Sequence, residues 1–333
     1  MIAPDWLRPP AVTDPTADAY KDWLHLNVFD HESGLVGLVN VSLHGDPADP
    51  RARAVGTGLL FVPGSDWSGR AEVLGLDEVS LGECSIAMEL VGLSVHHRSG
   101  TVAASVRVPE EELALSITAA AQVGSIVFER RPLGPGWFSW YGVPRLSVRG
   151  EAVVEGRRIP LDGASAYYDH NWGRWHWGDD LGWVWGAFLT PAPGPAFIVT
   201  QPTDRSHRRR GSSKLVVTFG DQRLRIFEGP GLELVHEGSL DGLDRRVPGA
   251  LAALHAGRAA ARPAARFRLV ADDGRDRVAL EFAGRSAVQV IAADPARPGY
   301  GFIHETVGEF ASEGRVGGID VAGAGLGVLE HAD

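Results

Sequence analysis

The stretch that decides the fold is GASAYYDHNWGRWHWGDDLGWVWGAFL, which runs from Gly163 to Leu189. It holds five of the chain's ten tryptophans, and seven of the ten lie between Trp137 and Trp185. The same stretch contains tyrosine, aspartate, histidine, asparagine and arginine side chains. This mixture of aromatic and ionisable residues is the strongest local signal in the sequence.

An extended backbone over the YYDHNW segment would separate its side chains onto two faces, because successive residues of a strand point to opposite sides. One face would carry Tyr167, Asp169 and Asn171, and the other Tyr168, His170 and Trp172. If the strand belongs to a barrel, either face that points inward buries an ionisable group beside aromatic rings. Such a group must find partners or become neutral.

On both sides of this segment the chain predicts short strands separated by turns of glycine, proline and aspartate. Examples are Leu35–Leu43, Ala54–Val62, Cys84–His97, Thr101–Val108, Leu146–Leu161 and the segments that follow Asp180. Roughly fifteen or more short strands exceed one eight-stranded barrel. The sequence therefore predicts an all-β protein of two tandem antiparallel barrels, residues 1–178 and 179–333. The best helix signal is the alanine-rich segment Pro248–Pro263.

Composition excludes several classes of protein. The chain has 333 residues, with 32 Lys and Arg against 42 Asp and Glu, so the net charge is −10. A general nucleic-acid-binding surface would be basic, and none is expected here. Cys84 is the single cysteine, which excludes an internal disulfide and a cysteine-based zinc site. No βαβ rhythm or phosphate-binding glycine motif follows a strand, so a nucleotide-binding fold is not expected.

No segment approaches the 18 consecutive apolar residues of a membrane span, and the N-terminus carries acids and prolines where a signal peptide needs a basic and then an apolar stretch. We expect a cytoplasmic protein that can make peripheral contact with a membrane. The run Arg208–Arg210 could clamp a phosphate, although such runs are more typical of solvated loop tips. The sequence leaves the oligomeric state open.

Simpler interpretations of the tryptophan-rich segment stay open at this point. Tryptophans can fill a barrel interior, and an Asp-His-Asn group can tie strands together as a satisfied polar network. A metal site is not expected, because His170 and His176 are six residues apart and no third ligand lies at a usual spacing. A serine hydrolase is not expected either, because no nucleophile-elbow motif is present.

The stretch WYGVPRLSVRGEAVVEGRRIPLDGASAYYDHNWG (Trp140–Gly173) resembles the signature of the carotenoid 1,2-hydratase (hydroxyneurosporene synthase) superfamily. That family pairs a VPRL-type strand with a strand ending in Asp-His-Asn-Trp-Gly, and a Trp-x-Trp-Gly strand follows, as Trp183–Gly186 does here. The segment Asp22–Leu43 resembles the family's opening hairpin, and the chain from Tyr300 onward resembles its closing strands. The resemblance implies two lipocalin-like β-barrels.

Members of this family hydrate the terminal double bond of acyclic carotenoids or cyclise prenylated substrates, as tocopherol cyclases do, and fungal relatives assist Diels–Alder ring closure. The resemblance thus implies a hydrophobic small-molecule substrate, polyene or isoprenoid-like, with no cofactor and no metal. Three functions follow as alternatives. They are an acid-catalysed hydratase or cyclase, a pericyclase of the same fold, and a lipocalin-like binding protein without catalysis.

Hydration of an unactivated alkene begins with protonation of carbon, which requires an acid that is neutral at the working pH. Asp169 would meet this need if burial raised its pKa from ~3.9 toward 7, a change of about 3 units or ~4 kcal/mol. His170 and Asn171 are expected to orient Asp169 or a water molecule. Aromatic faces would stabilise the resulting cation by roughly 0.5–2 kcal/mol per ring. The substrate-binding residues predicted on this basis are Tyr141, Tyr168, Trp172, Trp175, Trp177, Trp183 and Trp185.

A competing outcome is an ion pair between Asp169 and Arg145, Arg174 or a protonated His170, which would lower the pKa of the carboxyl. In that case the proton would have to come from another group, such as Glu305 or His304.

Overall fold

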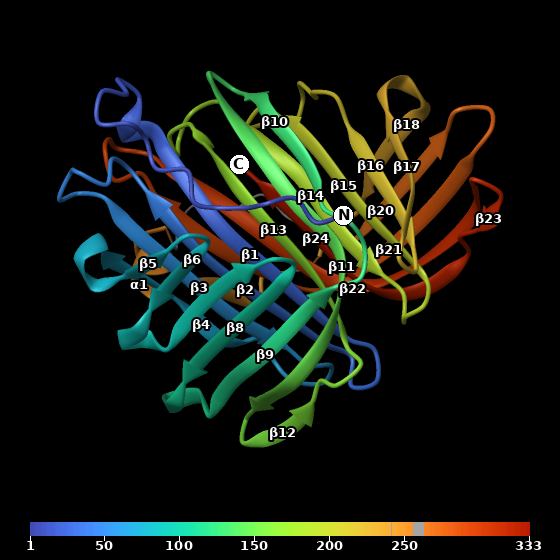
Figure 1. Ribbon diagram of the computed structural model, residues 1–333, viewed down its shortest axis with the longest axis horizontal. Coiled ribbons are helices and arrows are strands. Elements are labelled where there is room, and N and C mark those ends of the chain that lie inside the picture. Colours follow the sequence, from blue (N-terminus) through green and yellow to red (C-terminus); the bar gives the residue numbers. More distant parts are fainter. Residues whose placement is uncertain (241, 256–262) are drawn as a thin grey trace. The chain divides into compact units, whose positions relative to one another are not determined.

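The structure of the protein is a computed structural model that describes residues 1–240, 242–255 and 263–333. Strands dominate it, and the chain forms two barrel-like units, each built on one curled sheet that is almost entirely antiparallel (Figure 1). The all-β prediction is therefore confirmed. The first unit comprises Met1–Asp179 with Ala292–Gly301, and the second comprises Asp180–Ile291 with Phe302–Asp333.

The first unit contains a thirteen-stranded sheet within the described residues, in the order β4-β3-β2-β1-β13-β11-β9-β8-β7-β6-β5, with β10 and β12 added to β11. Its strands are β1 (Tyr20–Asp30), β2 (Leu35–His44), β3 (Arg53–Phe61), β4 (Ser68–Gly75), β5 (Ser80–Gly82), β6 (Ser85–Met88), β7 (Leu93–Arg98), β8 (Thr101–Val108), β9 (Leu113–Ala121), β10 (Ile126–Leu133), β11 (Gly136–Val154), β12 (Arg157–Pro160) and β13 (Ser165–Arg174). The sheet curls so that β7 lies against β2 and β3.

The interior of the first unit is apolar, because alternate residues of nearly every strand point into one cluster. In β9, for example, Leu113, Leu115, Ile117 and Ala119 are buried and belong to this cluster. The Glu155–Gly156 turn, in which both residues have positive φ, joins β11 to β12, as the alternating pattern around it predicts. Alternating apolar residues thus form the inner face of the sheet.

The second unit contains an eleven-stranded sheet in its described part, in the order β17-β16-β15-β14-β24-β22-β21-β20-β18, with β19 paired to β21 and β23 to β22. Its strands are β14 (Gly182–Leu189), β15 (Pro195–Thr203), β16 (Lys214–Phe219), β17 (Gln222–Glu228), β18 (Leu232–Glu237), β19 (Arg245–Val247), β20 (Arg266–Asp272), β21 (Arg277–Ala293), β22 (Tyr300–Val316), β23 (Ile319–Asp320) and β24 (Gly323–Ala332). Its pairs are antiparallel except for β19 with β21, which is parallel.

Helix is scarce in the described residues. The predicted helix over 248–263 is present as the single α-helix α1 (Gly249–Leu254), and the part of that prediction over 256–262 lies outside the described residues. The other helical elements are 3-10 turns: η1 (Ala17–Ala19), η2 (Leu76–Glu78), η3 (Glu89–Val91), η4 (Pro109–Glu111) and η5 (Gly229–Gly231). None of the described helices combines the length and the apolar character needed to cross a membrane.

Candidate functional site

Strand β13 is the centre of the candidate site, because it pairs with β1 on one side and β11 on the other. Its alternation agrees with the prediction from sequence. Tyr168 and Trp172 belong to the apolar interior of the first unit, and His170 contacts the Trp172 ring at 4.9 Å between centroids. Tyr167, Asp169 and Asn171 occupy the opposite face, and all three are buried. The strand therefore carries a polar cluster on each of its faces.

The first polar cluster surrounds Asp169, whose exposed fraction is only 4%. The Tyr167 hydroxyl donates to Oδ2 at 2.7 Å, and the Trp140 indole Nε1 donates to the same oxygen at 3.1 Å. The Asn171 amide donates to Oδ1 at 2.7 Å. Trp140 also donates to the Tyr167 oxygen at 3.0 Å, so these residues form one connected network. We call this group of four, Trp140, Tyr167, Asp169 and Asn171, the Asp169 network.

Glycine at position 142 makes room for this network. Gly142 lies directly opposite Asp169 in the pairing of β11 with β13. A Cβ atom at Gly142 would come within 2.3 Å of Cζ2 of Trp140, so the indole ring lies over the glycine backbone. The ring stacks on Phe128 of β10 at 5.2 Å between centroids. The close approach therefore positions the indole N–H for its bond to Asp169.

The same face of the sheet carries further polar side chains on β1 and β2. His25 lies opposite Asp169 in the register of β1 with β13, and its Nε2 lies 2.9 Å from Oδ1 of Asn27. Asn40 lies 3.3 Å from the other ring nitrogen of His25. His25 and Asn27 are buried, so this face supplies a polar surface around the carboxyl of Asp169.

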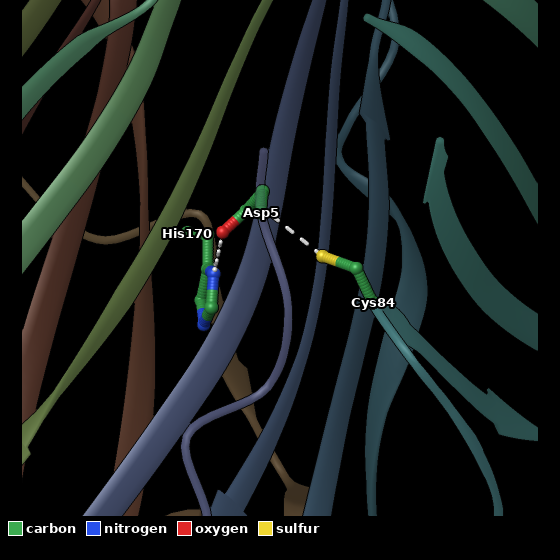
Figure 2. Close-up of side chains that lie close together, drawn as sticks. All are labelled: Asp5, Cys84 and His170. Atoms are coloured by element: carbon green, nitrogen blue, oxygen red, sulfur yellow. Dashed lines mark hydrogen bonds and ion pairs between the residues drawn. The ribbon is translucent and has the colours of Figure 1, made fainter. Parts of the chain in front are cut away.

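The second polar cluster lies on the inner face of β13 and centres on His170. Its Nδ1 lies 2.7 Å from Asp5 and its Nε2 lies 2.7 Å from Asp22. Asp5 comes from the N-terminal segment and accepts a bond from the Cys84 thiol at 3.3 Å, and Figure 2 shows Asp5 between His170 and Cys84. The Tyr20 hydroxyl donates to Asp22 at 2.9 Å. We call Asp5, Asp22 and His170 the inner ion cluster.

Electrostatics make the inner ion cluster a charged assembly. Burial alone would lower the pKa of His170, but Asp22 and Asp5 favour the imidazolium and raise the pKa to about 9. Burial would raise the pKa of Asp5, but its bonds to His170 and His97 hold that pKa well below its ordinary value. His170 is therefore an imidazolium that donates from both ring nitrogens, with ionised Asp5 on one side.

Asp5, Cys84 and His170 also lie close enough together to be considered as metal ligands. Their chemistry does not suit that role as they stand. Both ring nitrogens of His170 are engaged by carboxylates, and burial raises the pKa of the Cys84 thiol far above its ordinary value. A metal ligand must be deprotonated. The group is better explained as a hydrogen-bonded ion cluster.

The predicted site residues do not form one constellation. Tyr141, Tyr168 and Trp172 lie with His170 on the inner face, whereas Asp169 and Asn171 lie on the other face. Asn171 does bind Asp169 as expected, while His170 binds Asp5 and Asp22 instead.

The remaining predicted tryptophans lie elsewhere. Trp175 packs edge-on against Trp23 at 5.3 Å and against Trp177 at 6.3 Å, and the Trp177 indole donates to His44 at 3.3 Å. Trp183 and Trp185 belong to β14 of the second unit, where the Trp183 indole donates to Glu330. A shared pocket for these rings stays a prediction.

The arginines considered as partners of Asp169 make other bonds. Arg174 pairs with Asp14 at 2.9 Å, and Arg145 donates to Ser165 at 3.1 Å. The three bonds to Asp169 described above all come from neutral donors. An ion pair between Asp169 and an arginine stays a hypothesis.

The sequence did not predict that Trp140 binds Asp169 or that Asp5 and Asp22 bind His170. Trp140 belongs to the stretch that contains the VPRL motif. It lies two residues before Gly142 on the same face of one strand, and this spacing could have indicated that its ring covers the glycine. Asp22 lies in the segment that resembles the family's opening hairpin, but nothing local marks it as a partner of His170. Asp5 lies in a proline-containing segment without periodicity, so no pattern predicts that its side chain is buried.

Comparisons with known proteins bear on the fold. No protein-family model matches the sequence, and no curated protein is found to be similar to it. Among solved structures, a Nitrosomonas europaea protein described as a candidate AttH matches with a TM-score of 0.69 and 14% identity, over 98% of this chain and 99% of that one. Kievitone hydratase from Nectria haematococca matches with a TM-score of 0.60 and 12% identity, over 99% of this chain and 97% of that one.

CghA in complex with Sch210972 matches with a TM-score of 0.63 and 12% identity, over 100% of this chain and 96% of that one. These likenesses extend over both units, and they agree with the resemblance to the carotenoid 1,2-hydratase superfamily at the level of the fold. At 12–14% identity they show a shared fold, and the activity has to be argued from the site.

Proposed function

We propose that this protein is a cofactor-independent hydratase or cyclase that acts on a C=C bond of a hydrophobic, isoprenoid-like or polyene substrate. The observation that carries the proposal is the buried carboxyl of Asp169, which is hydrogen-bonded by Tyr167, Trp140 and Asn171. The likeness of the fold to kievitone hydratase and to CghA supports this class of function. Asp169 would transfer the proton.

The surroundings of Asp169 allow a protonated carboxyl. Burial favours the neutral form of a carboxyl, whereas hydrogen bonds donated to it favour the ionised form. Of the three donors, only the Trp140 indole is confined to donating, because a phenol hydroxyl and an amide can each turn to accept. The Asp169 network can therefore hold the carboxyl before and after it gives up a proton, and that is what an acid catalyst requires.

Aromatic rings near this carboxyl would serve the second requirement of the reaction. Protonation of an alkene leaves a carbocation, and the faces of aromatic rings stabilise a cation by roughly 0.5–2 kcal/mol each without trapping it. Trp140, which stacks on Phe128, and Tyr167 both donate hydrogen bonds to this carboxyl.

The substitution Asp169→Asn tests the proposal, with Asn171→Asp as a matched change in the same network. Turnover of a prenylated or polyene test substrate should fall at least 100-fold in Asp169→Asn, with substrate binding retained. In the wild type, activity should fall as pH rises through the pKa of the acid. Retained turnover would identify a pericyclase in which Asp169 is structural, and binding without turnover by the wild type would identify a binding protein. Either result would overturn the proposed acid.

A further inference from the structure

The second unit contains a pocket that the proposed function does not use. Its volume is about 240 Å³, and four histidines, two further polar side chains, one arginine and one aspartate contribute to its lining. This is smaller than a pocket for a drug-sized ligand, which is typically about 300–1,000 Å³. The histidines are His207, His236, His304 and His331. We call this the histidine pocket.

Strand register explains how distant parts of the sequence meet in it. Gln201 lies opposite Val184, Val184 opposite His331, and His331 opposite His304, so these side chains form one row across β15, β14, β24 and β22. Two residues further along the strands, Val199 and Leu329 belong to the apolar core of the unit. The row therefore separates a polar pocket from an apolar interior.

Two histidines are joined directly. Nε2 of His331 lies 3.0 Å from Nδ1 of His236, which comes from β18, and the ring centroids are 4.8 Å apart. His207 lies edge-on to His331 at 5.9 Å. Nδ1 of His331 is buried and has no hydrogen-bond partner among the described residues. Either ring can carry the proton of this hydrogen bond, so Nδ1 of His331 is an acceptor in one tautomer and a donor in the other.

The pocket carries one arginine, Arg210, among charged groups of both signs. Arg210, from the loop that follows β15, lies near His236 and donates to the backbone oxygen of Leu234 at 3.3 Å. Among the described residues, the other charged groups that act electrostatically on the lining are Arg246 on His304, Asp204 on His207 and Arg205 on Asp333. Burial lowers the pKa of His236 and of His304 to about 4, and it raises the pKa of Asp333 to about 6. The four imidazoles are thus largely neutral when the pocket is empty.

We propose that the histidine pocket binds a small organic acid, with its carboxylate between Arg210 and the His236–His331 pair and with one proton taken up by that pair. An anion placed beside two hydrogen-bonded imidazoles stabilises their protonated form, and it offsets the cost of burying a charge, which keeps them neutral. The apolar part of the ligand would lie against Val184, Pro263 and Ala264, which also line the pocket. A compact aromatic carboxylate combines these features.

The test is calorimetric titration of the full chain with benzoate at pH 7, in two buffers that differ in ionisation enthalpy. Benzoate should bind with uptake of about one proton, and benzamide, its neutral counterpart, should bind at least 10-fold more weakly. His331→Gln and His236→Gln should each weaken benzoate binding at least 10-fold and abolish proton uptake. Arg210→Gln should weaken binding and keep the uptake. His96→Gln, an exposed histidine of the first unit, is the matched control and should change neither.

Equal affinity for benzoate and benzamide, binding without proton uptake, or no binding of benzoate at millimolar concentration would each overturn the proposal. Arg210 is exposed, so its variant keeps the test available if a histidine variant fails to fold. Benzoate binding should be unchanged in Asp169→Asn. Ligand binding by the histidine pocket can therefore be refuted without affecting the proposed function, and the proposed function can be refuted without affecting ligand binding by the pocket.

Discussion

Replacing His170 by glutamine tests whether the inner ion cluster stabilises the first unit through its imidazolium. The pKa of His170 is raised from 6.5 to about 9, a difference of about 2.5 units, which corresponds to about 3 kcal/mol at ~1.4 kcal/mol per unit. Below pH 6.5 the proton is bound in both the folded and the unfolded chain, and the whole contribution is present. As pH rises through 9 the folded chain loses that proton, so the contribution is lost.

The measurement is urea unfolding followed by tryptophan fluorescence from pH 6 to 9.5, in the wild type and in His170→Gln. The difference in unfolding free energy between the two proteins should shrink by about 3 kcal/mol over this range. Taking the difference matters, because burial lowers the pKa of Lys21 to about 8, and that group makes stability rise with pH between about 8 and 10.5. Lys21 is present in both proteins, so its effect cancels.

A second variant, Asp22→Asn, removes one of the two carboxylates that raise the pKa of His170. The loss of stability should then begin at a lower pH than in the wild type. A difference between wild type and His170→Gln that stays constant from pH 6 to 9.5 would refute the argument, since it would mean that His170 carries the same charge in the folded and unfolded chains throughout.

Two further substitutions test the packing of the first unit. Gly142→Ala places a methyl group 2.3 Å from Cζ2 of Trp140, so it should cost about 1–3 kcal/mol in urea unfolding and reduce turnover by displacing the indole from Asp169. Gly242→Ala is the control: its methyl group would meet no described residue within 4 Å, so it should change stability by less than about 0.5 kcal/mol. Lys21→Met removes a buried ammonium that donates to the backbone oxygen of Trp175 at 3.0 Å and lies 3.5 Å from Asp294. It should lower the free energy of unfolding by about 3–5 kcal/mol, and the double variant Lys21→Met with Asp294→Asn should recover part of that loss. Full additivity of the two single changes would contradict a coupled pair.

Local patterns in the sequence predicted the fold class and the two faces of β13. Strand geometry dictates the alternation of YYDHNW, so it separates Asp169 from Tyr168 and Trp172. Alternation alone did not decide which of the two faces points inward. The bond from Asn171 to Asp169 joins residues two apart on one face, so it was accessible to the same reasoning.

Partners that arrive from distant segments could not be predicted in this way. Asp5 and His170 are separated by 165 residues, and the burial of Asp5 depends on how the N-terminal segment enters the first unit. His236 and His331 meet because β18 and β24 belong to one curled sheet, and no local pattern specifies that curvature. Periodicity assigns a side chain to a face, whereas its partners are decided by register and closure.

The two clusters on β13 depend on each other through the backbone. Asp169 and His170 are adjacent residues, so any constraint on the orientation of one peptide unit limits the other. His170 is held at both ring nitrogens by carboxylates 2.7 Å away, and Asp169 is held by three donors on the opposite face. A proton-transfer group needs an orientation fixed within a few tenths of an ångström, and supporting residues that are themselves locked provide it. The inner ion cluster is charged and is held further by the Cys84 thiol and the Tyr20 hydroxyl, so the contribution we expect from it to the proposed chemistry is to fix the strand from which Asp169 projects.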